Sequence, residues 1–313
     1  MSEPRILINI VLYNSDKNKI LELIRICLDY EQVKILLFDN ASDKHSLNYI
    51  DSEKVILYKS TKNVGIAGAH YYACEMAESE NFDFVLFLDQ DTQLPEYFVN
   101  SMILEFYQLQ KIHSRLVAIG PSWKDPRVYD WYQKKFKKFK KFVKFVKFVK
   151  FVKKALNKRF KITSKIDNIY RVNNVIISSG MLVLVKSLKN IGYPKKEYFI
   201  DLVDLEWCLR ALSKDYHVER LKKIQTQHTI GEIKTNKNSF MLYQNPMRYY
   251  YTIRNSFFLF REKQYPFDFR FFILIRNILE IKKIPFVPEP KKSLLAAIRG
   301  IKDGIYKKSS EIN

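Results

Sequence analysis

Two aspartates separated by one residue are the first feature of the sequence with an evident chemical use. Asp89 and Asp91 follow an apolar run at residues 82–88 that is typical of a buried strand. Mg²⁺ and similar hard cations prefer carboxylate oxygens and commonly bridge one or two carboxylates to the phosphates of a substrate. The pair therefore predicts a divalent-metal site, although a solvated turn in which Thr92 caps the next helix explains the same residues.

A second acidic cluster occupies residues 201–206. It contains Asp201, Asp204 and Glu206, and Trp207 follows at once. The attack of a sugar hydroxyl needs a positioned proton acceptor, and a carboxylate on a helix that leaves this segment could be that general base. The alternative is an ordinary acidic helix start, which the helix dipole favours.

Polar residues also follow two predicted strands near the N-terminus. Tyr13 and Asn14 end the first apolar run of the chain, and Asp39 and Asn40 follow the second. An aspartate at a strand end can accept hydrogen bonds from the ribose or base of a nucleoside. These residues are therefore candidates for a nucleoside pocket, with an ordinary turn as the alternative for Asp39 and Asn40.

Two further features are compatible with a nucleotide and its metal. Asn63 and Gly65 precede a predicted helix, whose N-terminal N–H groups can bind phosphate; the glycine spacing differs from that of the dinucleotide fingerprint, and a glycine-assisted turn is the alternative. His228 could complete the coordination of a metal ion as a neutral imidazole, or it could be a structural histidine.

The elements that must position these residues alternate in type. Short, nearly continuous apolar runs alternate with segments of helical periodicity, the runs lying at residues 6–13, 34–38, 55–58 and 82–88. This alternation predicts an α/β fold in which a sheet is covered by helices on both faces. Ligands of such sheets bind beyond the carboxyl ends of the strands, so the polar clusters are expected to meet there.

Composition limits the class of protein. With 313 residues, of which 47% are apolar, the chain can bury a full core, which excludes general disorder. Three distant cysteines exclude a disulfide framework and indicate a reducing compartment. No apolar run reaches the roughly 18 residues that a membrane span needs, so the protein is expected to be soluble or bound to a surface.

The formal net charge of +21 is partly a local feature. Residues 134–154 form a Lys/Phe/Val repeat that carries eleven lysines and no acidic residue. Three interpretations remain for this repeat: a surface insertion without a catalytic part, an arm that binds an anionic membrane, or a segment that contacts phosphates and bases of nucleic acid.

The C-terminal part of the chain, residues 238–313, is predicted to be helical, aromatic and basic. Within it, the segment 294–305 places leucine and isoleucine at helical spacing, with lysine and arginine around them. A basic amphipathic helix of this kind is typical of an anionic membrane interface. The alternative is a core helix that packs on the rest of the protein.

In order and spacing, seven elements resemble the family 2 glycosyltransferases of the GT-A fold, and within them the bacterial rhamnosyltransferase branch. The resemblance extends from Ile6 to about Arg261 and omits the Lys/Phe insertion. The elements are FDNAS (38–42), NVGIAGA (63–69), FLDQDT (87–92), SSG (178–180), FIDLVDLEWCLRA (199–211), QHTIG (227–231) and RYYYTIRN (248–255).

The resemblance implies a Rossmann-like, mixed and mostly parallel sheet in a domain at 1–237, followed by the helical region at 238–313. It implies Asp204 as catalytic base, with Val203 where the family commonly has a glutamate. It implies nucleotide-sugar contacts at Tyr13, Asn14, Asp39, Asn40, Asn63, Gly65 and Asp89, acceptor contacts at Asp201, Glu206 and Trp207, and metal ligands at Asp89, Asp91 and His228.

The implied reaction is a single inverting displacement that depends on Mg²⁺ or Mn²⁺. By resemblance the donor is dTDP-L-rhamnose and the acceptor a lipid-linked saccharide or polysaccharide, in cell-surface polysaccharide synthesis. The same fold could instead use a UDP-hexose or UDP-galactofuranose. The expected place is the cytoplasm, at the inner face of an anionic membrane.

A rival interpretation from another class remains open on the residues alone. The protein could be a non-catalytic basic module that binds membrane or nucleic acid, with its acidic residues in structural roles. Nucleic acid is not an expected partner of the glycosyltransferase.

Overall fold

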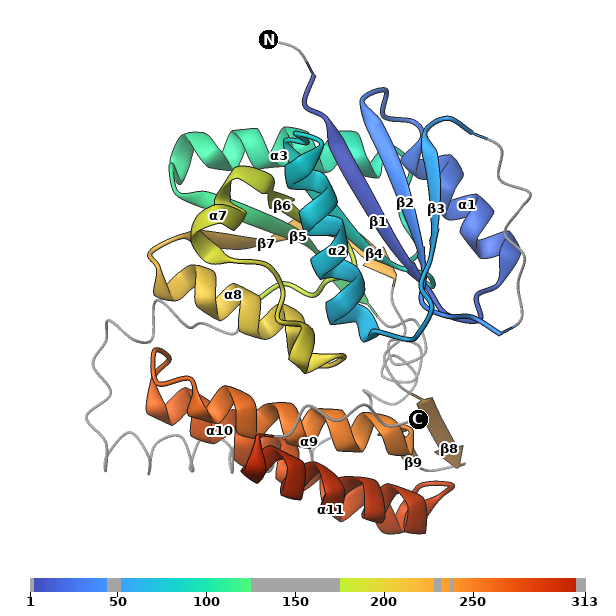
Figure 1. The fold of residues 1–313 in the computed structure, drawn as a ribbon, viewed down its shortest axis with the longest axis vertical. Coiled ribbons are helices and arrows are strands. Elements are labelled where there is room, and N and C mark those ends of the chain that lie inside the picture. Colours follow the sequence, from blue (N-terminus) through green and yellow to red (C-terminus); the bar gives the residue numbers. More distant parts are fainter. Residues whose placement is uncertain (1–2, 44–51, 125–174, 228–231, 237–238, 308–313) are drawn as a thin grey trace, which may run out of the picture.

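A seven-stranded sheet forms the centre of the protein (Figure 1). The computed structural model describes residues 3–43, 52–124, 175–227, 232–236 and 239–307. The insertion at 134–154 and His228 lie outside these residues.

The strand order of the sheet is β3-β2-β1-β4-β6-β5-β7. Parallel pairing joins β1 to β2 and β4, β2 to β3, and β5 to β7, whereas β6 is antiparallel to both β4 and β5. The predicted α/β fold with a mixed, mostly parallel sheet is therefore confirmed. The strands are β1 (Ile6–Leu12), β2 (Val33–Asp39), β3 (Val55–Lys59), β4 (Phe84–Asp89), β5 (Leu116–Lys124), β6 (Met181–Leu184) and β7 (His217–Gln227).

Helices cover both faces of the sheet, as the continuous apolar strands predict. Strand β1 is buried throughout, and its alternate residues Ile6, Ile8 and Ile10 join the core cluster that contains α1 and α3, whereas Leu7 joins the one that contains α2 and α8. The helices of this part are α1 (Lys17–Cys27), α2 (Gly65–Ser79), α3 (Phe98–Ile112), α7 (Leu188–Ile191) and α8 (Val203–Ser213), with short 3₁₀ turns η3 (Val185–Ser187) and η4 (Lys196–Tyr198).

Three C-terminal helices form a separate layer on the side where β1 to β4 end (Figure 1). Helix α9 is the inner member, because its Phe258 packs against Ala67, Tyr198 and Val203 of the α/β part. Helices α10 and α11 pack against α9 in turn. Their bounds are α9 (Pro246–Arg261), α10 (Phe267–Leu279), η5 (Glu280–Phe286) and α11 (Pro290–Tyr306), and a hairpin of β8 (Glu232–Asn236) and β9 (Ser239–Tyr243) precedes them.

Helix α11 packs through its small residues. Ser293, Ala297, Gly300 and Gly304 are buried, and a Cβ atom on Gly300 would lie 2.6 Å from the backbone oxygen of Tyr250 in α9. Ile301 is partly buried against the cluster that contains Ala297, whereas five other large apolar residues of α11 are exposed: Leu294, Leu295, Ile298, Ile305 and Tyr306. The segment therefore packs on the rest of the protein, as one of its two interpretations expects, but leaves most of its large apolar side chains outside that contact.

No helix among the described residues combines the length and the apolar character that crossing a membrane requires.

The close approach of α11 to α9 makes Gly300 sensitive to any side chain. We expect Gly300→Val to lower the free energy of unfolding by about 1–3 kcal/mol, the usual cost of overpacking, although valine is the better helix former. Urea denaturation measures this change. The control Leu295→Ala, at a side chain that is 68% exposed, should change stability by less than about 0.5 kcal/mol. Equal stability of Gly300→Val and wild type would contradict the packing described here.

Candidate active site

The polar residues that follow β1, β2 and β4 meet at one edge of the sheet. Val11 at the end of β1 is paired with Asp89 of β4, and Leu12 is paired with Asp39 of β2. The side chain of Gln90 links two of these strand ends, because it accepts a hydrogen bond from Tyr13 N at 2.7 Å and donates one to Tyr13 O at 3.1 Å. The expected convergence of these clusters is therefore present in the fold.

The turns after β1 and β2 are held by hydrogen bonds between them. Asn14, in a left-handed conformation with φ of 47°, donates its N–H to Ser42 Oγ at 2.9 Å. The buried Asp39 carboxylate accepts the N–H of Ser42 at 3.1 Å. The ring of Tyr13 is 47% exposed beside them. This part of the edge thus combines an exposed aromatic ring with a fixed carboxylate.

The glycine turn before α2 has a structural role in the fold. Asn40 Oδ1 accepts the N–H of Val64 at 2.7 Å, and Asn63 Oδ1 accepts that of Gly65 at 2.9 Å. Gly65 has φ of +70°, and a Cβ atom there would lie 2.3 Å from the backbone oxygen of Phe199. The glycine therefore allows the loop that carries Phe199 to pack against the start of α2, and protein atoms already bind several of the N–H groups expected to face phosphate.

That loop, residues 197–202, leads into α8 and is strained. Phe199, Asp201 and Leu202 all have left-handed backbones, with φ between 60° and 66°. Such conformations cost free energy in residues other than glycine and persist only where surrounding structure holds them. Strain of this kind is common at functional sites.

Helix α9 supplies the contacts that hold the loop. Asn255, fully buried, donates its amide to the backbone oxygens of Tyr198, Ile200 and Asp201 at 2.8, 2.7 and 2.9 Å. Arg254, also buried, donates to Glu197 O at 2.6 Å. Two consecutive side chains of one helix thus bind four carbonyl groups of the strained segment.

The carboxylate of Asp201 is also bound by α9. Arg248 donates to both of its oxygens, with Nε 2.8 Å from Oδ2 and Nη2 on Oδ1, and Thr252 Oγ1 donates to Oδ2 at 2.9 Å. Burial lowers the pKa of Arg248, but the nearby carboxylates of Asp201, Asp89 and Asp204 outweigh it, so the net shift is upward. A cation therefore lies among the aspartates of both acidic clusters.

Asp204 lies in the first turn of α8 and faces the same edge. Its Oδ2 accepts the N–H of Ser178 at 3.1 Å, and its Oδ1 accepts the N–H of Leu205 at 2.8 Å. Burial raises the pKa of Asp204 above its ordinary value of 3.8, and the charge of Asp201 raises it further, against the lowering effect of the two backbone hydrogen bonds. The group is a carboxylate whose affinity for a proton is increased.

A short chain of contacts connects Asp204 to the first acidic pair. Ser179, next to the Ser178 that binds Asp204, is hydrogen-bonded through its hydroxyl to Thr92. Thr92 in turn accepts the N–H of Asp89 at 3.2 Å. Residues 89–92 form a turn, as the alternative for this pair expects, but Thr92 does not cap α3, whose N-cap is Tyr97. The two acidic clusters predicted from distant parts of the sequence lie on one edge.

Glu206 and Trp207 face the protein interior instead. Glu206 has no exposed surface and is bound by Arg210 at 2.9 Å, Lys195 at 3.1 Å and the hydroxyl of Tyr265 at 2.9 Å. Trp207 is 2% exposed and donates its indole N–H to a backbone oxygen. Fully buried side chains cannot contact a sugar in this conformation, so the predicted acceptor contacts at these two residues are not retained.

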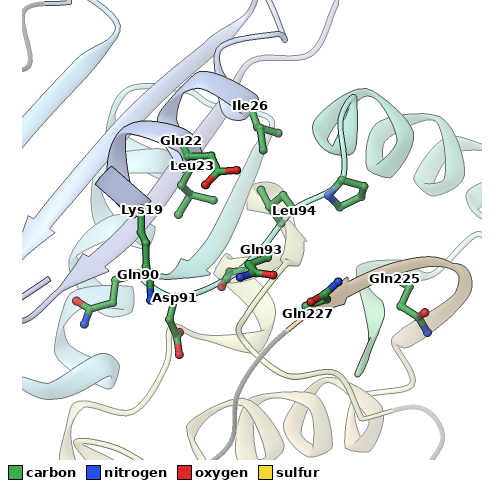
Figure 2. A pocket seen from close by; sticks show the side chains of 12 residues that line it. Lys19, Glu22, Leu23, Ile26, Gln90, Asp91, Gln93, Leu94, Gln225 and Gln227 are labelled. Atoms are coloured by element: carbon green, nitrogen blue, oxygen red, sulfur yellow. The ribbon is translucent and has the colours of Figure 1, made fainter. Parts of the chain in front are cut away.

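A cavity of about 370 Å³ adjoins Asp91 (Figure 2). It lies between α1, the segment 90–95 and the end of β7, and Figure 2 shows Lys19 extending from α1 toward Asp91. Backbone hydrogen bonds in both directions join Gln93 to Gln227, the last residue of β7. Gln227 is thus paired with a residue only two positions after Asp91 in the sequence. His228 is the next residue after Gln227.

The residues at this edge fit one kind of metal site. Asp89 and Asp91 are partly exposed carboxylates, which could supply oxygen ligands. Within the described part of the chain, no three His, Cys, Asp or Glu side chains are grouped closely enough to hold a metal ion. Mg²⁺ usually takes one or two carboxylates and completes its coordination with water and substrate phosphates. The edge therefore fits a metal that is bound together with a diphosphate.

Comparison with known proteins identifies the family. The profile described as "Glycosyl transferase family 2" matches residues 8–164, which is half of the chain and contains the strand ends described above. The chain belongs to glycosyl transferase family 2. It is therefore a glycosyltransferase, and the rival interpretation as a non-catalytic basic module is set aside.

A curated relative and solved structures agree with this assignment. The dTDP-rhamnosyl transferase RfbF of Shigella flexneri is 26% identical over 305 residues, covering 94% of this chain and 96% of that protein. The structure of S. aureus TarS 1-349 in complex with UDP-GlcNAc has a TM-score of 0.56 at 13% identity, covering 96% of this chain and 80% of that one. The complex of TarS 1-349 with UDP gives a TM-score of 0.50 at 12% identity, covering 97% and 92%. At these identities the TarS structures support the fold alone.

Sequence reasoning assigned no role to the residues of α9 that hold the site. Arg248, Thr252, Arg254 and Asn255 lie in the RYYYTIRN element, which was part of the family resemblance. The available signal was the presence of these four polar residues in an otherwise apolar and aromatic segment. Their partners could not be named, because they lie about 50 residues earlier in the chain.

The contacts of Asn255 lead to a testable expectation. Asn255→Ala removes the amide donor from three carbonyl groups, of which the Tyr198 oxygen keeps Arg254 as a donor, and this should cost about 1–3 kcal/mol of stability. The rate of sugar transfer should fall even at temperatures where the variant is still folded, because the loop that carries Asp201 loses its support. Thermal unfolding and a transfer assay below the melting range measure the two effects. The control Asn100→Ala, at an exposed position of α3, should change neither, and full activity of Asn255→Ala would show that α9 does not hold the site.

Proposed function

We propose that the protein is an inverting, metal-dependent glycosyltransferase that transfers L-rhamnose from dTDP-L-rhamnose to a lipid-linked or polysaccharide acceptor. The observation that carries this proposal is the placement of Asp204 beside the Asp89–Asp91 segment, through Ser178, Ser179 and Thr92. A base for the acceptor hydroxyl and ligands for a diphosphate then face one site. The name of the Shigella relative supports the choice of donor.

The general base in this proposal is Asp204. Asp201 is the nearby alternative, but both of its oxygens already accept hydrogen bonds from Arg248 and Thr252, which hold this carboxylate in a fixed position. Among the described residues, the hydrogen bonds to the Asp204 carboxylate come from backbone N–H groups, and burial raises its pKa. A proton from an acceptor hydroxyl therefore passes more readily to Asp204.

The nucleotide occupies the edge formed by the ends of β1 and β2. Tyr13 supplies an exposed ring on which a base can stack, and Asp39 supplies a carboxylate for base or ribose. Asn14, Asn40, Asn63 and Gly65 act through the turns: their observed hydrogen bonds fix the backbone around this pocket.

The metal in this proposal is Mg²⁺ or Mn²⁺, held by Asp89, Asp91 and His228. When bound, it neutralises charge that develops on the departing nucleoside diphosphate. Arg248 adds a fixed positive charge among the aspartates, and Asp201 orients it.

The acceptor in this proposal is bound to lipid at the inner face of the cell membrane, as a step in cell-surface polysaccharide synthesis. The Lys/Phe repeat at 134–154 and the basic C-terminal region at 238–313 favour contact with an anionic surface. A UDP-hexose or UDP-galactofuranose is the alternative donor, and the experiment below includes both.

The decisive test replaces the base. Asp204→Asn keeps the side-chain size but cannot accept the proton, so transfer from dTDP-L-rhamnose should fall at least about 100-fold, the usual contribution of a general base. Binding of the donor with Mg²⁺, measured as a thermal shift, should remain. Transfer at the wild-type rate would overturn the assignment of Asp204. If a UDP-sugar stabilises the protein and serves as donor while dTDP-L-rhamnose does neither, the assignment of the donor would be overturned.

The raised pKa of Asp204 gives an expected pH dependence. Only the ionised carboxylate accepts a proton, so activity is lost as pH falls through the pKa in the folded enzyme, and this pKa lies above 3.8. Asp201→Asn removes a negative charge that raises it, so the acidic limb of the kcat/KM profile should move to lower pH. The control Asp29→Asn, at an exposed position, should leave the limb in place. A shift to higher pH in Asp201→Asn would contradict the proposed coupling.

A further inference from the structure

The outer surface of the C-terminal layer exposes large apolar side chains on two helices. On α11, Leu294, Leu295, Ile298 and Ile305 are 45%, 68%, 53% and 51% exposed. On α10 and the turn that follows, the exposed side chains are Phe267, Phe271, Phe272, Ile275, Leu279 and Phe286. Both helices pack against α9, and exposed apolar surface concentrated in one layer of a protein is typical of an interaction site.

The packing of α11 explains why these side chains are exposed. Its contact with α9 uses Ser293, Ala297, Gly300 and Gly304, and the close approach at Gly300 and Gly304 leaves no room for a larger residue. Folding therefore buries the small face of α11 and leaves its leucine and isoleucine face outward. A sequence selected only for a stable core would have the opposite arrangement.

The charge of the same segment indicates the chemistry of the partner. Residues 267–307 contain nine Lys and Arg and four Asp and Glu. Asp303 is buried, and Glu280 and Glu289 are paired with Lys283 and Lys292, so the outward charge is positive. Lys291, Lys302 and Lys307 are exposed on α11 or directly after it, around the apolar side chains.

We propose that the apolar–basic face of α11, formed by its exposed leucine and isoleucine side chains and the lysines around them, docks on an anionic lipid bilayer. The leucine and isoleucine side chains enter the interface, and the lysines contact lipid phosphates. A second copy of this chain is the other candidate partner, but it would bring two positive faces together. Docking itself does not depend on the proposed function. Its purpose does, because docking would bring the site to a lipid-linked acceptor.

The first experiment places a reporter on the face. The native cysteines Cys27, Cys74 and Cys208 are all buried, so an introduced surface cysteine can be labelled selectively. A polarity-sensitive fluorophore on Leu295→Cys should shift to the blue with phosphatidylglycerol vesicles and not with phosphatidylcholine vesicles. The same label on Leu104→Cys, at an exposed leucine of α3, should not shift. A label at position 295 that stays in water while the protein binds these vesicles would overturn the proposal.

The second experiment removes the apolar contacts in the full chain. Leu294→Ser, Leu295→Ser and Ile298→Ser together should leave the fold intact, because these side chains make no part of the core, and should weaken vesicle binding at least tenfold. Leu104→Ser with Ile112→Ser is the matched control. A blue shift at position 295 that depends on protein concentration in the absence of lipid would assign the face to a second copy and overturn the proposal.

Transfer to a soluble acceptor separates this proposal from the proposed function. A serine variant that transfers normally in solution but does not bind vesicles supports docking and leaves the chemistry in place. A wild-type protein that docks but transfers no sugar would contradict the proposed function and leave docking in place.

Discussion

The candidate active site depends on the hydrogen bonds by which α9 holds the loop at residues 197–202. Three left-handed residues in this loop would relax in isolation, and the amide of Asn255 and the guanidinium of Arg254 hold their backbone in place. Helix α9 is itself sandwiched between the α/β part and α11. The loop that leads to Asp204 is therefore held by packing that begins in the last 70 residues of the chain, and the C-terminal layer is a structural part of the candidate site.

Charge organises the same site. Four aspartates gather at one edge, and an edge of this kind would repel a diphosphate if nothing balanced it. Arg248 balances part of this charge and binds Asp201 with two hydrogen bonds. Asp204 remains a carboxylate in a poorly solvated position, with its pKa raised. The two aspartates of one short segment thus have different chemical characters, because one faces a cation and the other faces backbone N–H groups.

The general fold and the catalytic edge could be predicted from the sequence, because both depend on local patterns. Continuous apolar runs define β1, β2 and β4, and the residues directly after a strand must lie at its carboxyl end, which places Asp39 and Asp89 correctly. Glu206 and Trp207 could not be placed in this way. Helical periodicity gives their faces, but their burial depends on Tyr265 and Lys195, which no local pattern connects to them.

The contact between Gly65 and Phe199 has a mechanical consequence. In the proposed site, the turn that opens α2 lies on the nucleotide side and Phe199 lies on the acceptor side. The Phe199 carbonyl accepts the N–H of Ala67 at 2.9 Å. Because Gly65 has no side chain, the two backbones are in direct contact. A donor that displaced the turn would therefore also displace the loop that leads into α8 and Asp204, so this contact couples the two sides of the proposed site.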